Sequence, residues 1–271
     1  MTEFTLAALL FAQVIAPPGG IEVSARSRAV QPGELVVLTL TLAAPAERVQ
    51  ARAFDRDIRG FQVSERIWTA LVGIDLDVRP GAYAVNVTAD DSARATYDLV
   101  VRPRTFRTRR LIVDEAFVTP PPSAQERIAR EAALLEATWT SPPGERLWAG
   151  NFARPVRGAA SSAFGTRSVF NGKPRSPHSG ADFTSPAGTP IHAPNGGRIV
   201  VARPLYFSGN TVIIDHGLGL FSMLAHLSAI NVLEGDRVAP GTIVGKVGAT
   251  GRVTGPHLHW AVRASGARVD P

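Results

Sequence analysis

Apolar and polar residues alternate along much of the chain, with the period of two that is typical of half-buried β-strands. In residues 20–103 the alternating stretches are short and are separated by turn signals such as Arg79-Pro80-Gly81. This pattern predicts strands over IEVSARS, ELVVLTLTL, RVQARAF, GIDLDV, AYAVNVT and ATYDLVV. Strands at such spacing favour a β-sandwich accessory domain of about 80 residues, immunoglobulin-like in size, with no catalytic constellation of its own.

The alternation stops in residues 104–146, which we interpret as a linker with one helix. A basic stretch leads into three prolines at positions 120–122, which favour an extended chain. A helix is then predicted over residues 123–138, opened by a Ser123–Glu126 capping box. Its apolar stripe should pack against a neighbouring domain, and the stripe comprises Ile128, Ala132, Leu135 and Trp139.

Alternation returns in residues 147–271. Strands are predicted over GRIVVARPL, NTVIIDHG, GLFSMLAHL, TIVGKVG and HLHWAVRA, with glycine-rich turns between them. No helical pattern of 10–15 residues interrupts this region. The chain is therefore expected to be mostly β, with a mostly antiparallel C-terminal domain.

The first residues carry a different signal. The apolar stretch Thr5–Ala16 is shorter than the ~20 residues that span a bilayer, but it suits the apolar core of a signal peptide cleaved after Ala16. The preceding residues depart from that pattern because they include Glu3 and no Lys or Arg. On the apolar stretch and the cleavage site, we still expect a signal peptide over residues 1–16 and export to the periplasm or cell envelope without a membrane span. The alternative is a buried N-terminal helix.

Composition narrows the chemistry. The net charge of +6 and the pI of about 10.6 suit an anionic partner such as a cell-envelope polymer, or simply a solvated basic surface. No aromatic-basic motif of a nucleic-acid binder is present, so no nucleic-acid partner is expected. The chain has no cysteine, so a metal site would need histidine and carboxylate ligands. All six histidines lie between residues 178 and 259.

The sequence GPHLHWAV places two of these histidines on one strand face. Because side chains alternate along a strand, His257 and His259 share a face, and Leu258 and Trp260 share the other. His178 and Asp182 form a second pair, four residues apart. Together with one member of the HLH pair they would give the three ligands and one open position of a catalytic zinc. The other HLH histidine, or His226, would then transfer protons.

The remaining polar candidates have simpler interpretations. His216 is expected to be a structural, hydrogen-bonding residue in a turn, and His192 a surface residue. Asn210 is a further candidate for the lining of the cleft.

A series of motifs in the C-terminal region resembles that of the LytM/lysostaphin-type zinc metallopeptidases. In chain order the motifs are HSGADF, NTVIIDHGLG, AHL, EGDRVAPGTIVGKVGATG and TGPHLHWAVR. The resemblance covers about residues 156–271. It implies that His178, Asp182 and His259 bind one zinc ion per chain. It also implies that His226 and His257 are the catalytic histidines, which orient or deprotonate the attacking water and stabilise the oxyanion; we favour His257 as the base.

The implied activity is that of a zinc metalloendopeptidase which hydrolyses peptide cross-links of bacterial peptidoglycan without a covalent intermediate, as a monomer. One alternative is a non-catalytic member of this family that regulates another wall hydrolase. A biotinyl or lipoyl carrier domain is disfavoured because the predicted hairpin has no lysine at its tip. A wall-binding role could coexist with catalysis, and residues 20–140 are long enough to plug the cleft and hold the enzyme latent.

Overall fold

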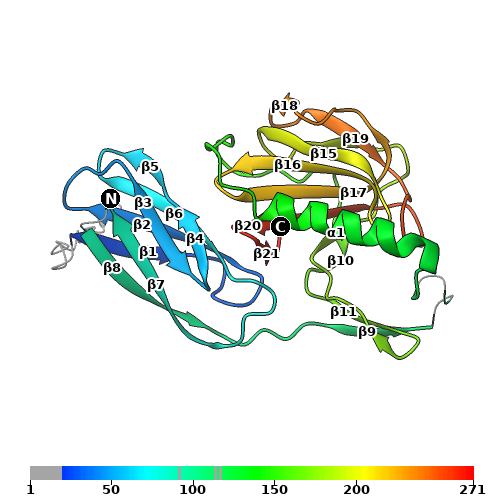
Figure 1. Ribbon diagram of the computed structural model, residues 1–271, viewed down its shortest axis with the longest axis horizontal. Coiled ribbons are helices and arrows are strands. Elements are labelled where there is room, and N and C mark those ends of the chain that lie inside the picture. The colour runs from blue at the N-terminus through cyan, green and yellow to red at the C-terminus, as the bar shows by residue number, and fades with distance from the viewer. Residues whose placement is uncertain (1–19, 91–92, 113–114, 116–117) are drawn as a thin grey trace, which may run out of the picture.

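The computed structural model describes residues 20–90, 93–112, 115 and 118–271. The predicted signal peptide lies outside the described residues. Figure 1 shows two β bodies side by side, joined by an extended segment, with one long helix along the C-terminal body. The prediction of a mostly β, mostly antiparallel chain is confirmed, and among the described strand pairs one is parallel. No helix in the described part of the chain is long and apolar enough to cross a membrane.

The N-terminal body is built from two four-stranded antiparallel sheets. One has the order β1-β2-β6-β5 and the other β4-β3-β7-β8. Their inner faces share one apolar core, to which β2 contributes Val36, Leu38 and Leu40, and β7 contributes Val85 and Val87. The strands are β1 (Ile21–Arg26), β2 (Leu35–Leu42), β3 (Val49–Ala53), β4 (Arg56–Arg59), β5 (Phe61–Ser64), β6 (Ile67–Gly73), β7 (Gly81–Ala89) and β8 (Ala93–Val101).

One predicted strand of the sandwich is wrong. The stretch GIDLDV, residues 73–78, leaves the sheet after Gly73, where β6 ends. Ile74 and Leu76 are buried although they lie in the turn region after β6. Their alternate spacing therefore resembles that of a strand. Strand β6, which ends where GIDLDV begins, was missed, and so were the short strands β4 and β5. Half or more of the residues of β4 and β5 are polar, which leaves little apolar alternation.

The linker is more structured than predicted. Strand β9 (Thr108–Leu111) joins β11 in the one parallel pairing. A 3₁₀ turn (Pro122–Ala124) then opens the helix α1 (Gln125–Trp139). The predicted capping box is wrong: Ala124 is the N-cap and no side chain caps the helix. Glu126 instead pairs with Arg130 one turn later, which is the competing i,i+4 interaction.

The stripe of α1 packs only in part as predicted. Trp139 contacts the C-terminal sheet in a cluster with Val201, Ile213 and Phe221, with Leu135 at its edge. Ala132 is exposed. The helix therefore lies along the C-terminal body, as Figure 1 shows, and not between the two bodies.

The C-terminal body centres on a ten-stranded sheet with the order β10-β13-β20-β17-β16-β15-β18, in which β19 joins β14 to β17 and β21 pairs with β20. Its core includes Val212, Leu224 and Leu258. The strands are β10 (Ala160–Ser162), β11 (Arg167–Phe170), β12 (Lys173–Pro174), β13 (Gly180–Phe183), β14 (Pro190–His192), β15 (Gly197–Leu205), β16 (Gly209–Gly217), β17 (Leu220–Ile230), β18 (Arg237–Val238), β19 (Ile243–Val247), β20 (Leu258–Ala264) and β21 (Ala267–Val269). β9, β11 and β12 form a separate small sheet.

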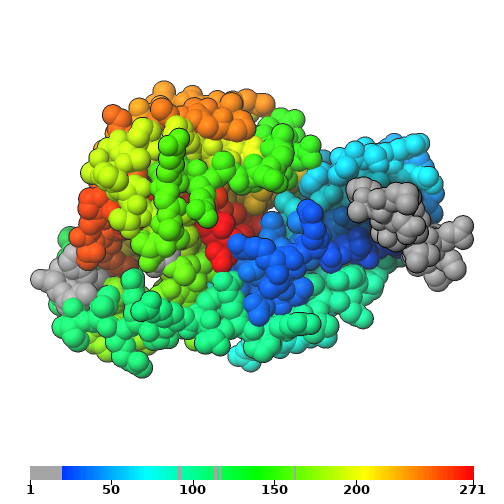
Figure 2. Space-filling model, turned by 180° about the vertical axis from the view of Figure 1, so that it is seen from behind, coloured from blue at the N-terminus to red at the C-terminus, as the bar shows by residue number. Residues whose placement is uncertain are grey.

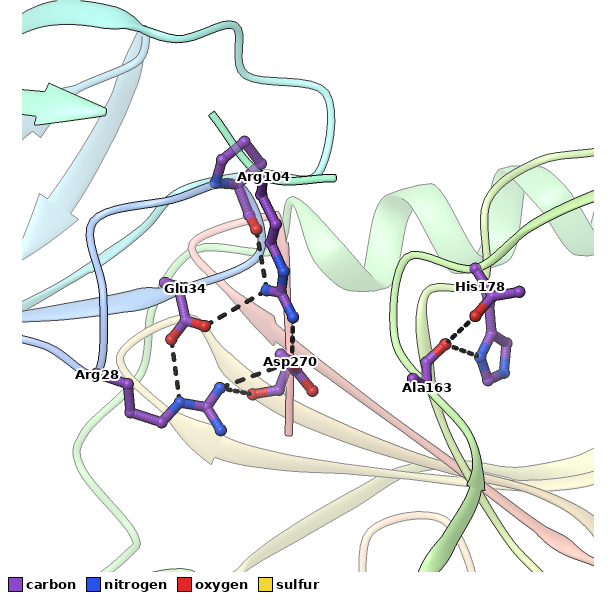
Figure 3. A network of polar contacts seen from close by, with 8 residues as sticks. Arg28, Glu34, Arg104, Ala163, His178 and Asp270 are labelled. Atoms are coloured by element: carbon purple, nitrogen blue, oxygen red, sulfur yellow. Dashed lines mark hydrogen bonds and ion pairs between the residues drawn. The ribbon is translucent and has the colours of Figure 1, made fainter. Parts of the chain in front are cut away.

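The end of the chain joins the two bodies. In Figure 2 the red C-terminal residues lie between the blue sandwich and the rest of the C-terminal body. Arg268 binds Asp75 through Nε at 3.0 Å and Nη2 at 2.6 Å. A second cluster, drawn in Figure 3, links Arg28 and Arg104 to Glu34 and Asp270. The sandwich is thus held at β21 and the residue that follows it, and Phe61 of β5 also packs against Trp148.

Candidate active site

Three neighbouring strands bring the predicted ligands together. β20 is central: His259 lies opposite Asp182 of β13 on one side and opposite Ala225 of β17 on the other. His178 precedes β13, and the loop holds it by hydrogen bonds between backbone groups of His178 and of Gly165 and Thr166. Leu258 is fully buried on the opposite face of β20, as the alternation predicted.

The ligand atoms of the three residues converge. His178 Nε2 lies 3.0 Å from Asp182 Oδ1 and 3.0 Å from His259 Nδ1, and His259 Nδ1 lies 2.9 Å from the same carboxylate oxygen. Among the described residues this is the group of His, Asp and Glu side chains compact enough to hold a metal ion. Two basic nitrogens and one carboxylate oxygen thus point at one spot.

This donor set fits zinc. Zinc accepts histidine nitrogen and carboxylate oxygen at roughly 2.0–2.2 Å, and three donors at tetrahedral angles then lie about 3.3 Å apart. The observed separations of 2.9 and 3.0 Å are close to that value. The three side chains are 14–17% exposed, which leaves one side open to the cleft.

Surrounding groups set the charge state of the ligands. The Nδ1–H of His178 donates to the carbonyl of Ala163 at 3.1 Å (Figure 3), so Nε2 carries the lone pair. Burial opposes ionisation of Asp182, but the close approach of His178 and His259 outweighs it and holds the pKa of the carboxyl well below its usual range. Burial lowers the pKa of His259. An ionised carboxylate beside neutral imidazoles is what a divalent cation requires.

His257 faces the same spot without belonging to the triad. Its Nε2 lies 3.8 Å from Asp182 Oδ1. Its Nδ1–H donates to the carbonyl of Gly255 at 2.9 Å, which leaves Nε2 free to accept a proton. The prediction that both histidines of the HLH pair face one object agrees with this geometry.

His226 reaches the site through a break in β17. Leu224 and Leu227 pair with Val212 and Asn210, so Ala225 and His226 stand opposite a single residue of β16. This is a β-bulge, and it turns the ring of His226 to 4.9 Å from the ring of His257. The Nδ1–H of His226 donates to the carbonyl of Thr250 at 3.0 Å.

The bulge forces His226 into an unusual conformation. Its φ is +68°, in the left-handed region that costs a non-glycine residue about 1–2 kcal/mol. The other described non-glycine residues with positive φ lie in connections between strands. Burial also lowers the pKa of His226 to about 4, so the ring is neutral at pH 7. No sequence signal announces this bulge, because glycine would be the ordinary choice there.

The other candidates lie elsewhere. His216 is structural but belongs to β16 and not to a turn: it is fully buried, its Nδ1–H donates to Gly196 O at 2.7 Å, and Nε2 contacts Ser222 Oγ at 2.9 Å. His192 is exposed on β14, as predicted. Asn210 donates to Leu227 O at 3.0 Å and does not line the cleft.

The histidines lie in a cleft of about 960 Å³. The linker forms part of its wall, which the sequence did not predict: Arg109 and Leu111 come from β9, and Leu135 and Trp139 from α1. No residue of the described sandwich lines the cleft. The apolar stripe of α1 was the sequence signal for this wall. It was expected to pack against a neighbouring domain and not to line the site.

Comparison with known proteins agrees with this arrangement. The model of peptidase family M23 matches residues 176–271. The crystal structure of a Pseudomonas aeruginosa protein assigned to peptidase M23 has a TM-score of 0.73 at 34% identity, covering 90% of this chain and 94% of that one. The peptidoglycan DD-endopeptidase ShyA of Vibrio cholerae is 43% identical over 94 residues, 35% of this chain and 22% of the relative. The DD-carboxypeptidase/endopeptidase Mpg of Neisseria meningitidis is 44% identical over 94 residues, with the same coverage of 35% and 22%.

The sheet, the cleft and the His-Asp-His donor set define a protein of the metallopeptidase class. The chain belongs to peptidase family M23. It spans 22% of the length of these curated relatives, and the part they share is the C-terminal body.

Proposed function

We propose that the chain is a zinc-dependent endopeptidase that hydrolyses peptide cross-links of bacterial peptidoglycan. The observation that carries this proposal is the convergence of three ligand atoms within 3.0 Å of one another, open on one side and faced by two further histidines. The names of ShyA and Mpg support the substrate and the bond type. The high pI suits the anionic wall.

In this proposal His178, Asp182 and His259 hold one zinc ion per chain. When bound, zinc is a Lewis acid that brings the pKa of water from about 15.7 towards 7 and polarises a carbonyl group. The carbonyl of Ala163 fixes the ring of His178 in this orientation.

The two remaining histidines divide the proton chemistry. His226 has a pKa of about 4, which makes it a poor proton acceptor at pH 7, but its free Nε2 accepts a hydrogen bond and so orients the attacking water or the substrate amide. The base is then His257, whose Nε2 is free and faces the ligand cluster. The proton that His257 takes from water returns to the leaving amide nitrogen, which completes hydrolysis without a covalent intermediate.

The alternative of a non-catalytic regulator loses support from this geometry. A regulator has no need of ligands or of a base, yet all three ligands and both further histidines are present in one cleft. Latency through residues 20–140 stays a prediction: no residue of the described sandwich lines the cleft, but Arg109, Leu111, Leu135 and Trp139 of the linker region do. Export to the cell envelope and a monomeric state belong to the proposal as well.

The test is release of peptides from purified peptidoglycan by the full chain. We expect new amino groups and conversion of cross-linked to uncross-linked muropeptides. His178→Ala should abolish release, whereas His192→Ala, an exposed histidine outside the cleft, should leave it unchanged. Equal release by wild type and His178→Ala, or none from any wall preparation by a zinc-loaded wild type, would reject the proposed function.

A further inference from the structure

The charged side chains of the cleft are almost all of one sign. Its lining contains the arginines Arg109, Arg175, Arg252 and Arg263, against the single carboxylate of Asp182. That carboxylate already belongs to the ligand cluster. The cleft therefore has an excess of positive charge, which a neutral peptide would not need.

The linker supplies one of these charges, Arg109, on a strand that holds it in place. β9 pairs with β11 so that Arg109 lies beside Ser168, and Leu111 beside Phe170. All four residues line the cleft, whereas Arg110, on the opposite face of β9, does not. The Nε of Arg109 donates to Ser168 Oγ at 2.8 Å, which directs the guanidinium. The strand pairing therefore makes β9 a wall of the substrate groove.

Arg175 and Arg252 are held in a similar manner. Arg175 donates through Nη1 to the carbonyl of Val118 at 3.1 Å and stacks 6.0 Å from the ring of Phe170. Arg252 lies 4.3 Å from the ring of Phe207. The charge of Arg175, after burial, lowers the pKa of Arg252, so the two guanidinium groups repel one another. Such repulsion is relieved when an anion enters between them.

Uncharged groups fix Arg109 and Arg175 without neutralising them. Within the part of the chain that the structure describes, neither forms an ion pair with a carboxylate. A guanidinium that is anchored at one edge presents its remaining N–H groups in the fork that matches a carboxylate.

We propose that Arg109 of the linker and Arg175 form a carboxylate-binding subsite, which selects peptides with free side-chain or terminal carboxylates next to the scissile bond. This inference rests on the proposed function and deepens it by naming the substrate class. An acidic stem peptide fits the groove, and a neutral peptide such as a glycine bridge does not use it. Arg109 and Arg175 are binding residues here and take no part in the proton chemistry.

The test compares two synthetic cross-linked peptides that differ only in whether their carboxylates are free or amidated, using the zinc-loaded full chain. We expect wild type to prefer the free acid in kcat/KM by about 10-fold to 100-fold. Arg109→Gln and Arg175→Gln should each reduce this preference at least threefold, mainly through a higher KM for the free acid. Arg110→Gln is the matched control and should keep the preference, and Arg109→Lys should restore part of it.

The outcomes separate this inference from the proposed function. If wild type cleaves both peptides equally, the subsite is rejected while the peptidase stands. If neither peptide is cleaved, fluorescence anisotropy of the labelled peptides decides: tighter binding of the acid that is lost in Arg109→Gln supports the subsite, and equal binding rejects it. Equally tight competition by polyphosphate would also reject it, because the surface would then attract any polyanion. Where Arg109→Gln or Arg175→Gln lowers the melting temperature, the glutamine variant at the other of these two positions decides.

Discussion

The sandwich and the C-terminal body solve the same problem in different ways. Both bury one face of antiparallel strands, and in both the alternation of apolar residues predicts which side chains are inside. In the sandwich β2 keeps this alternation along its whole length. In the C-terminal body β17 breaks it at His226, and β20 carries His259 on its open face, with His257 just before the strand.

The difference between the two regions shows where the candidate functional residues lie. The sandwich has no histidine, and its positive-φ residues Phe54, Asp55 and Asp90 lie in turns, where such conformations are ordinary. The C-terminal body has one positive-φ residue within a strand, His226. The partly exposed metal-ligand candidates lie beside it. A protein retains that strain only where surrounding structure enforces it, and here it aims a ring into the cleft. Substitutions in the cleft and substitutions at the contact with the sandwich should therefore affect different properties of the protein.

The largest effect is expected in the cleft. His257→Ala removes the proposed base and should lower kcat for peptide hydrolysis by about 10²–10⁴-fold, with zinc content unchanged because His257 is not a ligand. Stopped assays of muropeptide release, with metal analysis of the same samples, check both points. Loss of zinc together with activity would mean that His257 is a ligand and that the division of roles is wrong.

The joint between the two regions should affect stability and not catalysis. Asp75→Ala leaves Arg268, which is 19% exposed, without its main partner, and should lower the free energy of unfolding by about 2 kcal/mol. Asp77→Ala is the matched control, because Asp77 is 72% exposed and touches the same guanidinium; its effect should be under about 1 kcal/mol. Equal losses in the two variants would show that burial does not set the strength of this joint.

The same pair gives a pH dependence. Burial opposes the charge of Asp75, but Arg268 outweighs it and lowers the pKa from 3.8 to about 2. Because the folded-state pKa is depressed, the contribution is complete above about pH 4 and is lost as the pH falls through 2. The difference in stability between wild type and Asp75→Ala should therefore shrink across that window. A difference that is constant from pH 5 to pH 2 would contradict the assignment.

The smallest effect concerns the strain at His226. Glycine adopts φ of +68° without penalty, so His226→Gly should be more stable than His226→Ala by about 1 kcal/mol. Chemical denaturation of the two variants measures this. The neighbouring buried Ala225, whose φ is not positive, is the control, and Ala225→Gly should lower stability. If alanine is the better residue at position 226, the conformation is not strained.

Much of the site could be predicted from the sequence because its signals are local. The HLH alternation, the four-residue spacing from His178 to Asp182 and the motif series depend only on strand period and residue chemistry. β15 was predicted with its observed bounds, because apolar runs between glycine turns leave little choice. The assignment of His178, Asp182, His259, His226 and His257 to zinc and catalysis stays a prediction.

What the sequence could not predict depends on contacts between distant segments. The pairing of β9 with β11 joins Arg109 to Ser168, and neither stretch alone indicates it. The stretch GIDLDV imitated a strand because buried turn residues alternate too. The capping box at Ser123 failed because Glu126 pairs with Arg130 instead. In each case a tertiary or competing local contact overrode a correct local rule.

The central claim is that three ligand atoms converge to hold one zinc ion, and its most direct test is the metal content of the purified full chain and of His259→Ala. The account predicts one zinc per wild-type chain and none in the variant, with the variant still folded by circular dichroism. A folded wild type that binds no zinc at micromolar concentration, or a variant that keeps it, would contradict the account.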